Sequence, residues 1–420
     1  MFMMVIQGLV FRLQLRTGSM RHFYFSMALI PTLIFVFASA SSLNGQQPQH
    51  THVQTVQEDD LLNVVSLIGT KDDKFVYSAG FSSGSLVCFS REPKTGELVT
   101  SQVIQSVTAD GENAQEPNAE LLEMQGLISI SLSADEDWLI GCSIQQKGLM
   151  LFKRNLETGE LSLKSSLTNK QIGGRGLGFP VTVQFSPDAR FVYVANAGGK
   201  GSLSVFERDE DRLQFLHSHE GLPGELNGSR MMCCDPTGLY WYLSCGEAHT
   251  LVVFDRDEEE GHVRALRVIN DDSDEADQLG GASGLCCSPD GKHLYITSGR
   301  FKGDDAVSVF ARGENGQLTR VQELVSGTDL ENFSGGNHVT VSPDGKFVYV
   351  SGARSKNVAC FARSDEDGTL SFIDYLSVDG NANLGVTAGI YVSRDNQYVY
   401  VSGESEKAIF VFKRAKLDQQ

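Results

Sequence analysis

The hydrophobic and polar positions of the chain alternate as short runs, most clearly from Val181 to Phe206. The first apolar run ends at Ser186-Pro187-Asp188, where proline presets a tight turn and aspartate accepts bonds from the following backbone. The next run, from Phe191 to Ala195, is apolar on both alternating faces, as in a strand packed on both sides. Gly198 to Gly201 then reverse the chain into a third run, and an apolar segment at Leu213 to Leu216 follows. The pattern predicts four short antiparallel strands.

The same unit recurs along the chain, with an aromatic or apolar anchor in the second strand and a phenylalanine in the third. The second-strand anchors are Tyr77, Ile140, Tyr193, Tyr242, Tyr295, Tyr349 and Tyr400. The third-strand anchors are Phe89, Phe152, Phe206, Phe254, Phe310, Phe361 and Phe412. A repeat of about 50 residues with four short strands is typical of a β-propeller blade. The sequence therefore predicts an all-β fold, a seven-bladed β-propeller of four-stranded antiparallel blades.

The seventh unit ends with its third strand at Phe412 and has no fourth strand. A strand-like segment, Val53 to Gln57, precedes the first unit. We expect this N-terminal strand to pair with Ile409 to Phe412 as the outer strand of the last blade. Such pairing closes the ring and leaves no open sheet edge.

The N-terminal 40 residues have the pattern of a secretory signal peptide, with Arg21 before an apolar run and Ala38-Ser39-Ala40 at its end. Residues 1–19 lack this organisation, so Met20 is a candidate for the true start. An uncleaved anchor helix is the alternative, but the run is short for a membrane span of about 20 residues. We expect a signal peptide at 1–40, a linker at 41–50, the propeller at 51–415 and a tail at 416–420. The protein should be secreted or periplasmic, with no stable membrane span after cleavage.

The chain is strongly acidic, with a net charge of −18. Removing residues 1–40 leaves 32 basic residues against 53 acidic ones, or −21. This field disfavours nucleic acid and anionic membrane surfaces as partners. We expect a monomer that binds a small molecule.

The propeller topology places the Ser-Pro-Asp turns on one face and the less regular loops on the other, around the mouth of the central channel. Four arginines in these loops, Arg175, Arg230, Arg300 and Arg354, favour a small anionic ligand. Glu247 and Glu404 occur in the same set of loops. The loops leading into the inner strands are rich in glycine, which indicates either steric relief near the axis or an anion-binding backbone.

The repeated motifs, such as SPDGKFVYVSG from Ser342 to Gly352, resemble those of the lactonase family of seven-bladed propellers, which includes 6-phosphogluconolactonases and muconate-lactonising enzymes. The enzymes' Gly-Pro-Arg-His motif corresponds here to Gly228-Ser229-Arg230-Met231, so the arginine is present and methionine replaces the histidine. Their second strand ends in Asn-Glu, and the matching stretch here is Cys245-Gly246-Glu247, so the glutamate falls one position late. The sixth unit shows the reverse substitution: His338 is present at the entry of the inner strand, and Asn337 stands where the arginine would be.

The resemblance implies a lactonase-like hydrolase, or a related isomerase, acting on a small sugar-acid or carboxylated lactone. Opening a lactone needs a base to activate water and a cation to stabilise the oxyanion. The catalytic candidates are Glu247 or His338 as the base and Arg230 as the oxyanion clamp, with Arg175, Arg300 and Arg354 as ligand-binding residues. A non-catalytic propeller that binds a ligand or a protein through the same face is the alternative.

Eight cysteines in an exported chain suggest disulfides, but their positions favour buried thiols. Cys233-Cys234 and Cys286-Cys287 occupy equivalent inner-strand positions, and Cys88 and Cys360 each precede a third-strand phenylalanine. A bridge between the two vicinal pairs is the less favoured alternative. No cysteine spacing matches a zinc site, and the acidic run at residues 271–277 lacks the pattern of a calcium loop, so we expect no metal and no cofactor.

Overall fold

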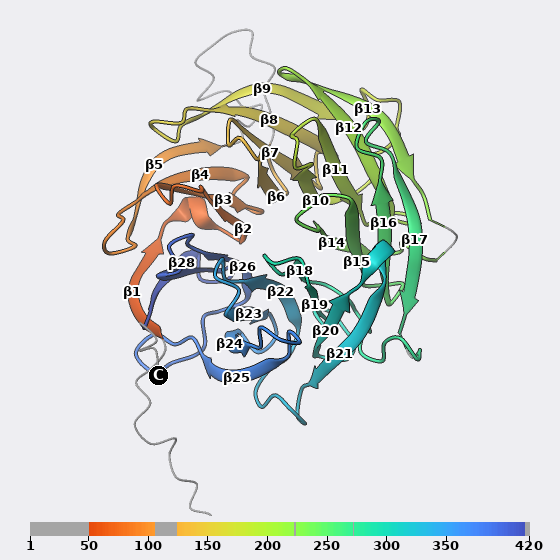
Figure 1. Ribbon diagram of the computed structural model, residues 1–420. Coiled ribbons are helices and arrows are strands. Elements are labelled where there is room, and N and C mark those ends of the chain that lie inside the picture. Colours follow the sequence, from red (N-terminus) through yellow and green to blue (C-terminus); the bar gives the residue numbers. More distant parts are fainter. Residues whose placement is uncertain (1–49, 106–123, 222–223, 272, 416–420) are drawn as a thin grey trace, which may run out of the picture. The chain divides into compact units, whose positions relative to one another are not determined.

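The computed structural model describes residues 50–105, 124–221, 224–271 and 273–415. Within these residues, the strands form seven four-stranded antiparallel sheets around a common centre (Figure 1). The predicted seven-bladed propeller is confirmed. The signal peptide, residues 41–49 of the linker and the tail lie outside the described residues.

Six blades are continuous in sequence and one is composite. Blades 1 to 3 comprise β2(Val64–Gly69), β3(Phe75–Gly80), β4(Ser85–Arg91), β5(Leu98–Gln105); β6(Leu127–Leu132), β7(Trp138–Ser143), β8(Gly148–Arg154), β9(Leu161–Thr168); and β10(Pro180–Phe185), β11(Phe191–Asn196), β12(Ser202–Asp209), β13(Arg212–His219). Blades 4 to 6 comprise β14(Ser229–Cys234), β15(Tyr240–Cys245), β16(Thr250–Arg256), β17(Val263–Asn270); β18(Leu285–Cys287), β19(His293–Thr297), β20(Ala306–Arg312), β21(Leu318–Val325); and β22(Gly336–Val341), β23(Phe347–Gly352), β24(Asn357–Arg363), β25(Leu370–Tyr375). Blade 7 comprises β26(Thr387–Val392), β27(Tyr398–Gly403), β28(Ala408–Arg414) and β1(His50–Gln57). In the described part of the chain, two short 3-10 helices, η2(Asp59–Leu61) and η3(Glu314–Gly316), lie in loops.

The N-terminal strand β1 closes the ring, as the sequence predicted. It lies beside β28 (Figure 1) and pairs with it in antiparallel orientation. In this pairing Val56 is opposite Ile409. Gln54 in β1 also bonds the backbone of Leu98 in blade 1, donating to its carbonyl at 3.0 Å and accepting from its N–H at 2.8 Å. Gln102 makes the same pair of bonds from blade 1 to Leu161 in blade 2. Strand β1 therefore acts as a regular outer strand, although it comes from the other end of the chain.

The repeated aromatic positions form the cores between blades. All fourteen second-strand and third-strand anchors are at most 1% exposed. Apolar packing on both faces of each sheet is what the unbroken apolar runs require, because each blade is covered by its two neighbours.

An arginine at the end of a third strand joins most neighbouring blades. Its guanidinium donates to the hydroxyl of an anchor tyrosine in the preceding blade, in the pairs Arg91–Tyr400, Arg154–Tyr77, Arg256–Tyr193, Arg312–Tyr242 and Arg363–Tyr295. Ion pairs to first-turn aspartates of the preceding blade are Arg91–Asp395, Arg256–Asp188, Arg312–Asp235, Arg363–Asp290 and Arg414–Asp344. The Ser-Pro-Asp turn thus reverses the chain and also links two blades.

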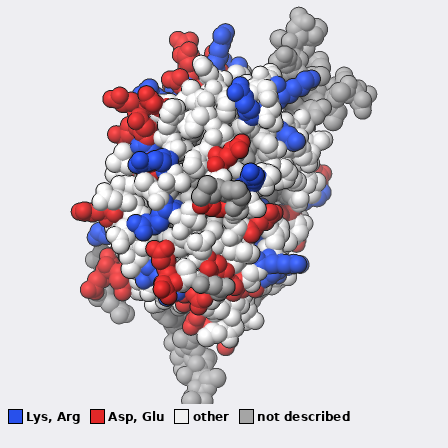
Figure 2. All heavy atoms as spheres, turned by 90° about the vertical axis from the view of Figure 1, so that its right-hand side faces the viewer, with Lys and Arg blue, Asp and Glu red and all other residues white. Residues whose placement is uncertain are grey.

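Acidic and basic side chains are interspersed over the side of the molecule seen in Figure 2. Among the described residues, the structure contains no helix with the length and apolar character needed to cross a membrane.

Candidate functional site

A cavity of about 450 Å³ lies in the channel at the centre of the propeller. Its lining includes residues from, or just before, the inner strand of every blade. The loops after second strands contribute Arg300, Phe301 and Glu404. The cavity therefore extends from the inner strands to loops on the face opposite the Ser-Pro-Asp turns.

Two arginines and one exposed phenylalanine dominate the polar end of this cavity. Arg230, the second residue of β14, places its guanidinium carbon 4.3 Å from the centre of the Phe301 ring. The guanidinium carbon of Arg300 lies 5.4 Å from the same centre. Phe301 is 67% exposed, so much of its side chain remains accessible from solvent. The ring holds two cations beside the cavity through cation–π attraction.

Arg230 is the less neutralised of the two cations. Its guanidinium makes no hydrogen bond or ion pair with any described residue, whereas Arg300 bonds Glu404 at 3.2 Å. Burial, together with repulsion from Arg300, lowers the pKa of Arg230 to about 10, against the attraction of Glu247 and Glu404. The Nη1 atom of Arg300 is also buried without a hydrogen-bond partner among the described residues. Unfilled donors on buried cations are costly, and an anionic ligand would satisfy them.

Glu404 supplies the carboxylate in the cavity lining. Burial raises its pKa above the ordinary value, although Arg300 and Arg230 act in the opposite direction. Within the cavity lining, this one carboxylate stands against two guanidinium groups, while the carboxylate of Glu247 attracts Arg230 from outside the lining.

His338, the third residue of β22, contributes a neutral imidazole. Burial lowers its pKa to about 4, so the ring is uncharged at neutral pH. Its Nδ1 atom is buried and has no hydrogen-bond partner among the described residues. An uncharged imidazole in a cavity can accept a proton from water, which is the property needed of a general base.

The other three predicted site residues lie outside the cavity lining. Glu247 is exposed in the loop after β15. Arg354 forms a close ion pair with Asp305 and donates to the carbonyl oxygen of Phe301 at 3.4 Å, so it holds the loop that carries Phe301. Arg175 is exposed and lies 5.8 Å from the ring centre of Phe215, in the outer strand of blade 3.

The glycines before the inner strands provide space. Gly228 has a φ of +65°, and a Cβ atom there would lie 2.7 Å from the backbone nitrogen of Glu247. Gly335 has a φ of +72°, and a Cβ atom there would meet the nitrogen of Arg354 at the same distance. Both positions favour the steric interpretation of these loops.

Sequence comparison identifies the family. The profile described as "Lactonase, 7-bladed beta-propeller" matches residues 145–267, 182–384 and 334–420, which together cover about two thirds of the chain. The chain belongs to the lactonase family of seven-bladed β-propellers. An uncharacterized protein of Staphylococcus saprophyticus is 30% identical over 132 residues, which are 30% of this chain and 35% of that relative. The matched segment thus spans only about a third of the relative's length.

Several solved structures are similar in fold to this lactonase-family chain. The periplasmic gluconolactonase PpgL of Pseudomonas aeruginosa is similar with a TM-score of 0.59 and 20% identity, covering 76% of this chain and 86% of that one. A protein from Lactobacillus plantarum is similar with a TM-score of 0.58 and 16% identity, covering 74% of this chain and 84% of that one. Hydrazine synthase of Kuenenia stuttgartiensis is similar with a TM-score of 0.62 and 14% identity, covering 86% of this chain and 98% of that one. Likeness at this identity shows the fold, and proteins of different chemistry share it.

Within this lactonase-family site, Phe301 was not predicted from the sequence, and Glu404 was recognised only as a residue of the right set of loops. The sequence feature that could have indicated Phe301 is its position between two cations, Arg300 and Lys302, in an otherwise polar loop.

The cysteines are free in the structure, as the sequence favoured. None of the eight forms a disulfide. Cys88, Cys142, Cys245 and Cys360 are buried, and the two vicinal pairs are partly buried.

Proposed function

We propose that this lactonase-family protein is a hydrolase that opens a small anionic lactone in the central cavity. The observation that carries the proposal is the guanidinium of Arg230, which lines the cavity with unfilled donors. A sugar-acid or carboxylated lactone offers both an anionic group and an ester carbonyl. Arg230 and Arg300 would bind its charge or the developing oxyanion, since charge-assisted bonds to guanidinium are strong.

His338 is the base that the geometry favours over Glu247. Neutral His338 lines the cavity, whereas Glu247 is exposed outside its lining. In the proposed reaction, the imidazole removes a proton from water as the oxygen attacks the lactone carbonyl. The ring C–O bond then breaks, and the ring oxygen leaves as a hydroxyl after taking up that proton. The product is a hydroxy acid.

Turnover of aldonolactones with and without a carboxylate or phosphate group tests the proposal. His338→Gln should lower kcat by about 100-fold or more, the usual contribution of a general base. Glu247→Gln is the comparison from outside the cavity lining; it removes a charge that acts on Arg230 but no base, so it should lower kcat much less than His338→Gln. Absence of wild-type turnover, or equal loss in both variants, would contradict the assignment.

Ligand binding without catalysis is the second candidate. It is favoured by the unpartnered Nδ1 of His338, because a catalytic histidine is usually held in place by a hydrogen bond at its second nitrogen. Calorimetric binding of the hydroxy acid by a protein that does not hydrolyse the lactone would support this candidate.

Export to the periplasm or the cell exterior is a further part of the proposal. It is supported by the signal-peptide pattern of the N-terminal 40 residues and by the likeness to a periplasmic gluconolactonase of Pseudomonas aeruginosa. Fractionation of the producing cells, with N-terminal sequencing of the mature protein, tests it. Cleavage after Ala40 is the expected result.

A further inference from the structure

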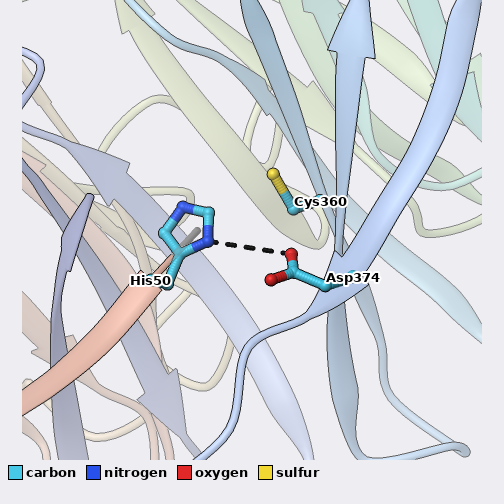
Figure 3. Close-up of side chains that lie close together, drawn as sticks. All are labelled: His50, Cys360 and Asp374. Atoms are coloured by element: carbon cyan, nitrogen blue, oxygen red, sulfur yellow. Dashed lines mark ion pairs between the residues drawn. The ribbon is translucent and has the colours of Figure 1, made fainter. Parts of the chain in front are cut away.

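Three potential metal ligands meet where the ring closes, outside the lining of the central cavity. His50 lies in β1, Cys360 in β24 and Asp374 in β25. Their ligand atoms all lie within 4.8 Å of one another. Figure 3 shows the imidazole of His50 facing the carboxylate of Asp374, with Cys360 beside them; Nδ1 and Oδ1 are 3.7 Å apart. The three residues bring together blade 6 and the strand that completes blade 7.

Two of these ligand atoms have no hydrogen-bond partner among the described residues. The side chain of His50 is only 3% exposed, and its Nδ1 is buried and unpartnered. The Oδ1 atom of Asp374 is buried and unpartnered as well. Leaving such polar atoms buried and unpaired costs about 1–3 kcal/mol each, so something that binds both would stabilise the fold.

Tyr349 determines which nitrogen of His50 faces the other two ligands. Its hydroxyl lies 3.0 Å from Nε2, on the opposite side of the ring from Nδ1. The equivalent hydroxyls of Tyr77, Tyr193 and Tyr295 donate instead to a glycine carbonyl in the outer turn of the next blade. Blade 7 has no such turn, because its outer strand comes from the N-terminus. His50 takes the place of that carbonyl as the partner of the Tyr349 hydroxyl. This explains the hydrogen bond at Nε2 but leaves the buried Nδ1 without a partner.

We propose that His50, Cys360 and Asp374 bind a divalent transition metal ion of the Zn²⁺ type. Histidine nitrogen, cysteine thiolate and carboxylate oxygen are the ligands that zinc takes in proteins. A neutral imidazole, a thiolate and a carboxylate carry a charge of −2, which the ion neutralises in a mostly buried place. No zinc spacing is visible in the sequence because the ligands come from strands at opposite ends of the chain.

The geometry requires a modest closing of the site. Zinc bonds of about 2.0–2.3 Å in tetrahedral arrangement bring ligand atoms to about 3.3–3.6 Å from one another. The Nδ1 to Oδ1 distance of 3.7 Å is already near this value. The thiol would move by about 1 Å toward the other two ligands, and water or another group would take the fourth position.

Metal binding would release the thiol proton. Burial raises the pKa of Cys360, and the nearby Asp374 acts in the same direction, so the metal-free thiol is protonated. The ion forms the bond to sulfur as the proton leaves to solvent. Because the site joins β1 to blade 6, bound metal should stabilise the closed ring.

A simple ion pair between protonated His50 and Asp374 is the competing explanation. It would use the same two residues and would leave Cys360 only its place in the apolar core beside Tyr349. The cysteine therefore distinguishes the two explanations, and a matched control exists in blade 1. Cys88 occupies the equivalent position in β4, where its cross-strand partner is Gln102 instead of Asp374.

The experiment titrates Co²⁺ into the reduced, chelator-treated full chain and follows the near-ultraviolet absorption of a cobalt–thiolate bond, with Zn²⁺ as competitor. Wild type and Cys88→Ser should bind one equivalent and show the band, whereas Cys360→Ser should not. Tyr349→Phe should weaken binding by about 10- to 100-fold, as expected for a residue that orients a ligand. Zn²⁺ should raise the unfolding temperature of wild type and Cys88→Ser but not of Cys360→Ser.

Two results would overturn the proposal. One is the absence of stoichiometric binding to folded wild type. The other is binding that persists in both Cys360→Ser and His50→Gln, which would place the metal elsewhere, for example at the vicinal cysteines. His50→Gln keeps an amide that can bond Tyr349, so its effect does not depend on loss of that contact.

Discussion

The arginine that joins blades 5 and 6 offers a quantitative test of how the ring is held together. Arg363 is 2% exposed in its side chain and donates to Tyr295 at 2.7 Å, to Asp290 at 2.8 Å and to the carbonyl of Gly345 at 3.1 Å. Replacing it with methionine keeps an unbranched apolar stem and removes these bonds. Tyr295 would still donate to Gly368, at 2.9 Å.

The expected loss follows from these contacts. Removing one partner of a buried ion pair costs about 3–5 kcal/mol. Asp290 is 35% exposed, so water can solvate its carboxylate in the variant. We therefore expect a loss of unfolding free energy at the lower end of this range, about 3 kcal/mol. The control is Arg264→Met, because Arg264 pairs with Asp255 but is 75% exposed. An exposed pair contributes about 0–1 kcal/mol.

Denaturant unfolding of both variants and of wild type measures the difference. Arg363→Met should lower the midpoint with little change in slope, and Arg264→Met should leave it nearly unchanged. Equal effects of the two substitutions, or an effect of Arg363→Met below about 1 kcal/mol, would refute the view that these arginines stabilise the ring.

Three further predictions concern pH and ring closure. Although partial burial acts in the opposite direction, hydrogen bonds from Ser186 and Arg256 lower the pKa of Asp188. Its contribution to stability should be present above the ordinary value of 3.8 and be lost as pH falls through the lowered value, as unfolding titrations down to pH 2 would show. Burial lowers the pKa of His338 from 6.5 to about 4. As the pH is lowered between these values, the free energy of unfolding should fall by about 3 kcal/mol in wild type but not in His338→Gln. Denaturant unfolding from pH 7.5 to 4 measures this difference. Gln54→Leu should cost about 1–3 kcal/mol in denaturant unfolding, because two hydrogen bonds from β1 to blade 1 are lost; a change much smaller than that of the equivalent Gln102→Leu would contradict the role assigned to β1.

The fold could be predicted because its determinants repeat. Each blade must bury one large residue, usually aromatic, in its second strand and a phenylalanine in its third, so the same residue types recur at nearly constant spacing. The closing strand β1 was predictable for a related reason, since a seventh unit without a fourth strand needs a partner from elsewhere. The blade-joining role of the Ser-Pro-Asp aspartate was not predicted, because its arginine partner belongs to the next repeat.

The site was predictable where a candidate lies on an inner strand. Arg230 and His338 are the second and third residues of β14 and β22, close to the axis, and both line the cavity. In the loops after second strands, distance along the chain from the strand does not decide which residues line the cavity. Glu404 immediately follows β27 and Arg300 lies three residues after β19, and both line the cavity, whereas Glu247 and Arg354 lie two residues after their strands and are outside the lining. Loop geometry of this kind has no signature in residue type or spacing.

The most direct test of the proposed function is the ratio of kcat/KM for an anionic lactone to that for its neutral analogue, compared in wild type and Arg230→Gln. A charge-assisted hydrogen bond contributes about 1.5–3 kcal/mol, so the wild type should prefer the anionic lactone by about 10- to 100-fold. Arg230→Gln should lose most of that preference, while Arg175→Gln, outside the cavity lining, should keep it. Equal turnover of the two lactones by wild type, or a preference that survives Arg230→Gln, would contradict the assignment of this cavity to an anionic lactone.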